Sequence, residues 1–324
     1  MGKFKEVPYR TYDHGDIEEE WWLHKRSNDW WYASGYLNDE GGNLYSFQYT
    51  MLRLYPKGLI PIYLLMLAMT DFQTKEHFYF QRFTPRSRDF TVESKLLQFG
   101  DYAKVVRDKD SMKIVVKTMK FSFDLQLDYG KGVIWHCNNG VVRKGVFKPK
   151  QFTTYYSWTN MPTKGTITVN GKTHRVSGKT WFDKEYGTFD MLNRGTHWEW
   201  FSLRFFDDEE IMMFHFPQSN FQDGTYITRE GKAERLNIYT LTTLGFVEAM
   251  GCKFSSGWKV RFPDIKDEHY VITPIMKGQA NLAYFEELCY VFDRNDKKVG
   301  MCFVELMPGC HNTHFPRTFS ANVG

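Results

Sequence analysis

The chain has 324 residues, which is enough for one large or two ordinary domains with a buried core. Its formal net charge is only +4 and no long basic run is present, so neither nucleic acid nor an anionic membrane surface is expected as a partner. The five cysteines include no close pairs, which argues against a disulfide framework and favours a reducing, cytoplasmic compartment.

Residues 1–28 are predicted to form a polar lead-in, because they are rich in charge and carry an acidic run at 16–20. The first ten residues contain no apolar segment of the kind that marks a signal peptide. The longest apolar run, residues 59–69, includes Pro61 and is too short to span a bilayer. We interpret it as a buried strand and expect no transmembrane segment.

Aromatic residues are unusually frequent: 28 Phe, 19 Tyr and 10 Trp make up 18% of the chain. Aromatic side chains favour strands, and stripes of apolar residues with helical spacing are hard to find here. The pattern predicts a hairpin from strands at 29–37 and 44–48, and further strands at 62–70, 77–83, 102–107, 112–118, 121–128 and 141–147. Many short strands without intervening helices indicate a barrel or a sandwich.

The second half of the chain repeats features of the first. Trp198, Trp200 and Ser202 match Trp30, Tyr32 and Ser34 in order and spacing, and residues 178–183 match residues 300–305. Each half therefore opens with a Trp-rich hairpin and closes on a glycine, an aromatic residue and a carboxylate. This repeat predicts two similar antiparallel β-barrels in tandem, at 29–190 and 191–324.

The stretch from Ser177 to Gly187 is the strongest candidate for a site. On a strand, Trp181, Asp183 and Glu185 share one face, while the residues between them point to the other face. Two carboxylates beside an indole indicate either a solvated strand end or a functional site. Glu305 occupies the position of Asp183 in the second half, which favours a structural role as strongly as a catalytic one.

The motifs, taken in order, resemble the two-domain lipocalin-like proteins grouped with carotenoid 1,2-hydratase and AttH-type proteins. They are Trp30-Trp31-Tyr32 with Gly35, residues 135–140, Tyr155-Tyr156-Ser157, residues 177–187, Trp198-Glu199-Trp200-Phe201 and Val304-Glu305-Leu306. The resemblance implies two tandem lipocalin-like (calycin) barrels, a pocket near their junction, no obligatory cofactor and a hydrophobic small-molecule ligand.

Relatives in this group add water to unactivated alkenes, and fungal relatives hydrate prenylated phenolics or guide pericyclic ring closures. In the carotenoid hydratases, the Asp that matches Asp183 is proposed as the proton donor. This chain has Tyr156-Ser157-Trp158 where those enzymes have an implicated His and Trp, and it is closer there to the AttH branch.

These observations predict acid-catalysed hydration or isomerisation of a C=C bond in an isoprenoid- or polyketide-like molecule. Asp183 is expected to donate the proton and Glu185 to activate water, with one proton shared by the two carboxyls. The expected substrate-binding residues are Trp181, Tyr155, Tyr156, Ser157, His136, Trp198, Trp200 and Glu305. The alternatives are a pericyclase-like cyclisation template and a non-catalytic carrier of a lipid or other hydrophobic ligand, and for each aromatic residue simple core packing.

No metal site is expected. Residues 310–314 contain one cysteine and two histidines, but their spacing supplies no third or fourth ligand. The sequence also lacks the local signatures of serine hydrolases, phosphate-binding loops and dinucleotide-binding turns. A triad of Ser157, His136 and Asp183 is unsupported without a nucleophile elbow.

Overall fold

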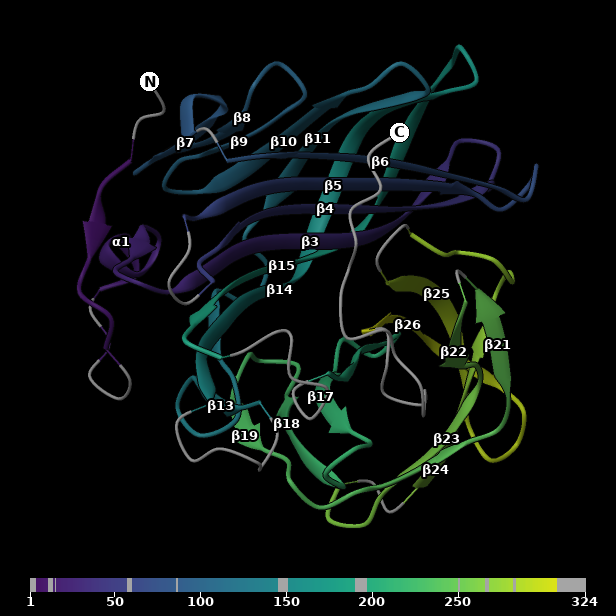
Figure 1. The fold of residues 1–324 in the computed structure, drawn as a ribbon. Helices are drawn as coiled ribbons and strands as arrows, with labels where there is room; N and C mark the ends of the chain where they lie inside the picture. Colours follow the sequence, from purple (N-terminus) through teal and green to yellow (C-terminus); the bar gives the residue numbers. More distant parts are fainter. Residues whose placement is uncertain are drawn as a thin grey trace.

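The computed structural model describes residues 4–10, 14, 16–56, 60–85, 87–144, 151–189, 197–249, 251–265, 268–281 and 284–307. In this part of the chain almost every element is a strand, and two curled antiparallel sheets follow one another along the sequence (Figure 1). The predicted all-β fold of two tandem lipocalin-like barrels is confirmed. The predicted boundary at 190/191 and the segment 310–314 lie outside the described residues.

The first barrel is a thirteen-stranded sheet in the order β6-β5-β4-β3-β15-β14-β11-β10-β9-β8-β7, with β12 and β13 also paired to β14. Its strands are β3 (Asn28–Asp39), β4 (Leu44–Leu54), β5 (Ile62–Asp71), β6 (Glu76–Thr84), β7 (Phe90–Glu93), β8 (Leu96–Phe99), β9 (Ala103–Arg107), β10 (Ser111–Lys117), β11 (Phe121–Asp128), β12 (Val133–Trp135), β13 (Val141–Arg143), β14 (Phe152–Val169) and β15 (Lys172–Gly187). A short 3-10 helix, Ser87–Asp89, precedes β7. The predicted hairpin and the strands expected between 62 and 128 are all present, with small shifts at their ends.

The second barrel is a nine-stranded sheet in the order β19-β18-β17-β16-β26-β25-β24-β23-β20. Its strands are β16 (Glu199–Phe205), β17 (Glu210–Phe216), β18 (Phe221–Ile227), β19 (Ala233–Arg235), β20 (Thr240–Thr243), β23 (Trp258–Phe262), β24 (Glu268–Pro274), β25 (Phe285–Phe292) and β26 (Lys298–Leu306). Strands β21 (Phe246–Ala249) and β22 (Cys252–Ser255) form a separate pair beside it.

The two barrels close in the same way. In the first, the closing strand β15 pairs with the opening strand β3, and Asp183 lies opposite Tyr32. In the second, the closing strand β26 pairs with the opening strand β16, and Glu305 lies opposite Trp200. The register of both pairs agrees with the repeat seen in the sequence.

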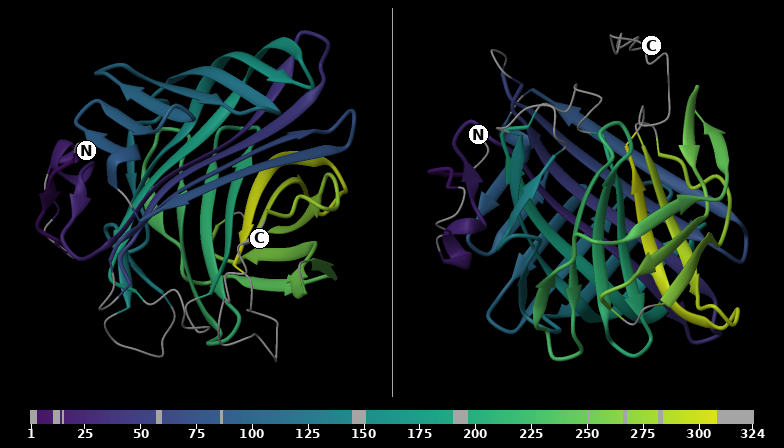
Figure 2. Two further views of the ribbon diagram at one scale, coloured as in Figure 1. Left: turned by 45° about the horizontal axis from the view of Figure 1, so that its top comes forward. Right: turned by 90° about the horizontal axis from the view of Figure 1, so that it is seen from below.

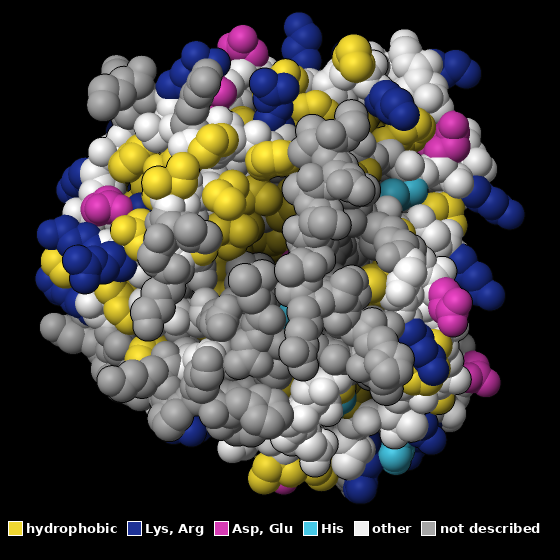
Figure 3. Space-filling view, viewed as in Figure 1, with side chains coloured by type: hydrophobic (Ala, Val, Ile, Leu, Met, Phe, Trp, Pro, Cys, Tyr) yellow, Lys and Arg dark blue, Asp and Glu magenta, His cyan; other side chains and the backbone are white. Residues whose placement is uncertain are grey.

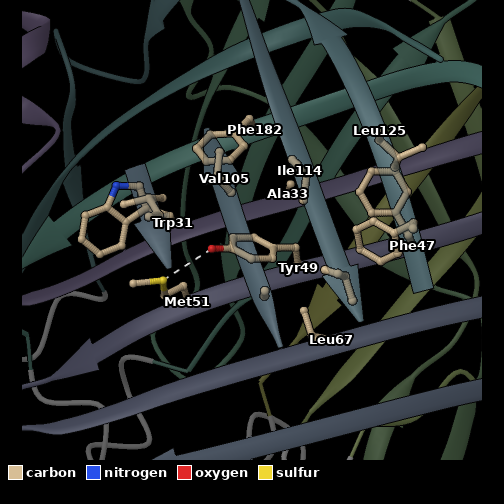
Figure 4. Close-up of a cluster of buried hydrophobic side chains, with 14 of the residues drawn as sticks. Trp31, Ala33, Phe47, Tyr49, Met51, Leu67, Val105, Ile114, Leu125 and Phe182 are labelled. Carbon is tan, nitrogen blue, oxygen red and sulfur yellow. Dashed lines mark hydrogen bonds between the residues drawn. The ribbon is translucent and has the colours of Figure 1, made fainter. Parts of the chain in front are cut away.

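Each barrel has its own apolar interior. Figure 4 shows part of the first, where Trp31, Ala33, Phe47, Tyr49 and Phe182 are among the packed side chains. A separate cluster fills the second barrel around Phe201, Trp258 and Val304. The alternation of side chains along each strand sends every second residue to the opposite face, where a third cluster forms between the barrels.

The segment expected to be a polar lead-in contains short elements: β1 (Glu6–Val7), α1 (Ile17–Glu20) and β2 (Leu23–His24). No helix in the described part of the chain has the length and apolar character needed to cross a membrane. Trp21 is fully buried and packs against Trp31, Trp158 and Phe182 of the first barrel. The segment therefore closes one end of this barrel.

The two barrels lie side by side, with the opening strands β3 and β16 at their interface (Figure 2). The rings of Tyr32 and Trp200, which are equivalent in the repeat, meet at 5.6 Å. Arg204 reaches from β16 to Ser34 on β3, donating to its hydroxyl at 2.7 Å and to its carbonyl at 3.1 Å. Because equivalent positions meet one another, the interface resembles that of a two-fold symmetric dimer.

Candidate active site at the barrel interface

The predicted acidic stretch lies on β15, where the first barrel meets the second. Alternation along this strand places Trp181 in the interface cluster and Phe182 in the interior of the first barrel. Asp183 and Glu185 are buried, with 4% and 3% of their surfaces exposed. The stretch is therefore a buried centre between two barrels rather than a solvated strand end.

Three hydrogen-bond donors converge on one oxygen of Asp183. The Tyr155 hydroxyl donates to Oδ1 at 2.9 Å and the Trp181 indole at 2.5 Å, and the Ser157 hydroxyl donates to the same atom. Burial raises the pKa of Asp183 to about 7, although these donors act in the opposite direction. Since Oδ1 accepts these three bonds, Oδ2 is the oxygen available to hold a proton, and the raised pKa favours the protonated form nearer to neutral pH than in an ordinary aspartate.

His136 extends this network behind Ser157. Pairing of β12 with β14 places Ile134 opposite Ser157, and the chain then brings His136 Nε2 to 2.7 Å from Ser157 Oγ. Burial lowers the pKa of His136 to about 3, so the ring is neutral and donates through Nε2 while Ser157 donates to Asp183. The serine is the middle member, which differs from a Ser-His-Asp relay, where histidine lies between the other two.

Glu185 has a different partner from the one expected. The Lys144 ammonium lies 2.8 Å from its carboxylate, and the Thr153 hydroxyl also donates to it. Lys144 is enclosed by rings, 3.7 Å from the centroid of Phe214 and 4.5 Å from that of Trp198. Burial raises the pKa of Glu185 and Lys144 opposes that shift. The ion pair fits a structural anchor better than a water-activating base.

The predicted aromatic residues separate into two groups. Trp181, Trp198, Trp200 and Tyr155 are all in the interface cluster, where the rings of Trp181 and Trp200 meet edge to face at 6.2 Å. Tyr156 lies on the opposite face of β14, in the interior of the first barrel. The structure thus brings three indoles and one phenol close to the carboxylates and leaves Tyr156 apart from them.

Glu305 lies on the second barrel's side of the same interface, and it has a neighbour that the sequence did not indicate. The Trp198 indole donates to Glu305 Oε1 at 2.7 Å. Glu286, directly opposite Glu305 on β25, accepts a hydrogen bond of 2.9 Å from the Tyr32 hydroxyl. The adjacent acids at 286 and 287 were a possible signal for this residue, but without the register of β25 they do not show which one faces the interface.

Two surface features adjoin this centre. A hollow of about 350 Å³ lies at the junction, between Ile134, Cys137 and Asn139 of the first barrel and Thr225 and Arg235 of the second. It lies on the His136 side of the network, since its lining includes both neighbours of that residue in the chain.

The second feature is apolar. On the face seen in Figure 3, apolar side chains gather around a hollow over β3 to β6. Leu52 of β4, Met66 of β5 and Tyr284 form a small buried cluster, and Trp30 and Met307 pack against both this cluster and the interface cluster. Packed apolar side chains therefore connect the outer face of the first barrel with the interface cluster.

Solved structures with the same fold are known. The chain matches a putative AttH from Nitrosomonas europaea with a TM-score of 0.81 and 18% identity, over 93% of this chain and 99% of that one. It matches kievitone hydratase from Nectria haematococca with a TM-score of 0.68 and 15% identity, over 87% and 89% of the two chains. The structure of CghA with Sch210972 gives a TM-score of 0.55 at 8% identity, over 94% and 95%.

At these identities the likeness to solved structures establishes the fold. A comparison with curated proteins gives no match. The model of the AttH-like family, in contrast, matches residues 6–309, which is nearly the whole sequence and includes both barrels. The chain belongs to the AttH-like family.

Proposed function

We propose that the protein is an enzyme that hydrates or isomerises a C=C bond in a hydrophobic small molecule, with Asp183 as the proton donor. The observation that carries this proposal is the state of Asp183, a buried carboxyl with a pKa of about 7 and one free oxygen beside indole rings. Protonation of an alkene needs an acid that stays protonated near neutral pH. The carbocation formed next can be stabilised by the aromatic rings of the interface cluster.

The substrate class follows from the surroundings. The interface cluster is aromatic, and the hollow over β3 to β6 is apolar, so a substrate with an isoprenoid or similar hydrocarbon portion suits both. The shared fold with kievitone hydratase supports hydration of a prenylated phenol, and the shared fold with CghA is compatible with a cyclisation in which Asp183 acts as a hydrogen-bond donor. Of these, hydration makes the most direct use of an acid.

The test uses the full chain, kievitone and a panel of prenylated phenols and linear isoprenoid alkenes in isotopically labelled water. We expect at least one compound to gain one labelled water, detected by mass spectrometry. Asp183→Asn should reduce the rate by about 100-fold or more, the usual effect of losing a general acid, and should remain folded. Asp124→Asn is the matched control, since Asp124 is an exposed residue of β11 far from the interface.

Two results would count against the proposal. If Asp183→Asn retains the wild-type rate, another group supplies the proton. If no compound gains water but one of them co-purifies or binds unchanged, the interface is a carrier site.

A further inference from the structure

The second barrel contributes its own pair of acids to the interface. Glu286 and Glu305 are direct partners in the antiparallel pair β25–β26, so their side chains project side by side on the same face. Glu286 is 2% exposed, whereas Glu305 keeps some contact with the surface. Neither takes part in an ion pair within the described residues, and Lys144, whose charge acts on Glu305, is paired with Glu185.

The donors around this pair are too few for two carboxylates. Tyr32 donates to Glu286 Oε2, and Trp198 donates to Glu305 Oε1. In the described structure, Oε1 of Glu286 receives no hydrogen bond, although it is buried. An ionised carboxylate left without a donor in such a place is costly, and a second carboxylate beside it adds repulsion.

A single proton shared by Glu286 and Glu305 would reduce both the cost of the unpaired buried oxygen and the repulsion between the two carboxylates. When Glu286 is protonated, it can donate to Glu305, and only one negative charge remains on the pair. Burial raises the pKa of Glu286 well above its usual range, and the neighbouring Glu305 and the more distant Asp183 act in the same direction. Burial also raises the pKa of Glu305, but the Trp198 indole, the Glu286 carboxyl and the Lys144 charge all oppose that rise, so we assign the negative charge of the pair to Glu305.

A chain of ring contacts connects the pair to Asp183. Trp181, which donates to Asp183, meets Trp200 at 6.2 Å, and Trp200 meets Tyr32 at 5.6 Å. Tyr32 in turn donates to Glu286. Asp183 and the carboxyl pair are therefore linked through contiguous side chains of the interface, and the charge of Asp183 contributes to the raised pKa of Glu286.

We propose that Glu286 and Glu305 hold one proton between them and form the second acid–base centre of the site, with Glu305 as the base that activates water. This step rests on the proposed function. Asp183 gives its proton to one alkene carbon, a water oxygen bonds to the other carbon, and the proton released by that water moves to Glu305. Asp183 ends ionised and the pair ends doubly protonated, and one proton returned from the pair to Asp183 through solvent restores the starting state. The overall change is the addition of one water to the double bond.

The shared proton is tested without any substrate. The infrared spectrum of the full chain at neutral pH should contain a C=O band from protonated carboxyl groups. In Glu286→Gln the intensity of this band should fall by the contribution of one carboxyl, because Glu305 then ionises alone. Glu248→Gln, which alters an exposed acid on β21, should leave the band unchanged. If Glu286→Gln does not reduce the band in a variant with the wild-type circular dichroism spectrum, the shared proton is disproved.

The role of Glu305 is tested with kievitone in deuterated water. Asp183 protonates the alkene reversibly, so recovered substrate gains deuterium even when water addition is blocked. We expect Glu305→Gln to reduce hydration by about 100-fold while this deuterium exchange continues. If exchange and hydration fall together in a folded Glu305→Gln variant, Glu305 is not the base. If the wild-type chain shows neither reaction, the proposed function fails for this probe, and the infrared result still decides whether the proton is shared.

Discussion

Asp183 and Glu185 are two positions apart on one strand, and burial raises the pKa of both, but their partners differ. Among the described residues, the hydrogen-bond donors to Asp183 are all neutral, so burial dominates and favours the protonated acid. Glu185 lies 2.8 Å from an ammonium, which favours the carboxylate. The environment, rather than the residue type, therefore separates a candidate proton donor from a structural anchor.

The raised pKa of Asp183 makes a prediction about stability. The pKa of this carboxyl is about 7 in the folded protein against an ordinary value of 3.8, so the folded state binds the proton more tightly than the unfolded state. The carboxyl therefore destabilises the fold increasingly as pH rises from about 4 to about 7. Asp183→Asn should thus melt near the wild-type temperature at pH 4 and above it at pH 8. The upper limit of the gain is on the order of 4 kcal/mol. Thermal denaturation across this pH range measures it, and a variant that is less stable at pH 8 contradicts the assigned pKa.

The pair of Lys144 and Glu185 makes a second prediction. Lys144→Met leaves a buried carboxylate without its cation and should cost about 3–5 kcal/mol in the free energy of unfolding. Adding Glu185→Gln removes the unpaired charge and should restore much of that loss, which urea denaturation of the single and double variants can measure. Additive effects in this cycle would show that the two residues are not coupled.

At the scale of single elements, the closing strands explain why both halves carry a glycine at equivalent places. A Cβ at Gly178 would lie 2.0 Å from the Tyr36 carbonyl oxygen, and one at Gly300 would lie 2.7 Å from the Arg204 carbonyl oxygen. Tyr36 and Arg204 occupy equivalent positions on the opening strands β3 and β16. The repeated glycine thus allows each closing strand to approach its opening strand closely.

Gly178→Ala is therefore expected to destabilise the first barrel by about 1–3 kcal/mol, because backbone atoms must move to admit the new methyl group. Gly41→Ala is the matched control, since a Cβ there meets only side-chain atoms, the nearest at 3.3 Å. Chemical denaturation compares the two variants. Equal stability of both would mean that the closing strand adjusts without strain.

The sequence predicts those features of the whole molecule that depend on neighbouring residues or on the internal repeat. Alternation along residues 177–187 predicted which side chains share a face, and the repeat predicted two barrels with equivalent closing strands. Tyr156 was expected beside Tyr155, although neighbours on a strand point to opposite faces. Lys144 follows Arg143 and resembles a surface residue in sequence, but it is buried among side chains from both halves of the chain, including Trp30 and Phe214. Glu286 was missed because its position depends on a register that links distant strands.

The interface between the barrels holds the candidate site together. Substitution of Arg204 can measure how much this interface contributes to the free energy of unfolding. Arg204 is 4% exposed and forms no ion pair with the described residues, and it donates to Ser34 of the first barrel and to Ser202 of its own. Its guanidinium also lies 5.6 Å from the Trp181 ring. Arg204→Ala would leave a cavity and unpaired serine hydroxyls, which should together cost about 2–4 kcal/mol.

Urea unfolding followed by tryptophan fluorescence measures this loss, with Arg229→Ala as the control because Arg229 is exposed and its hydrogen bond in the described part of the chain goes to a backbone carbonyl. If the barrels depend on each other, Arg204→Ala shifts one transition shared by both barrels, because burying the interface cluster stabilises both at once. A variant that instead unfolds in two separated steps would show that each barrel is stable alone. In that case the carboxylates on the two sides of the interface would be held together only weakly, and the two-sided acid site would need a ligand to assemble it.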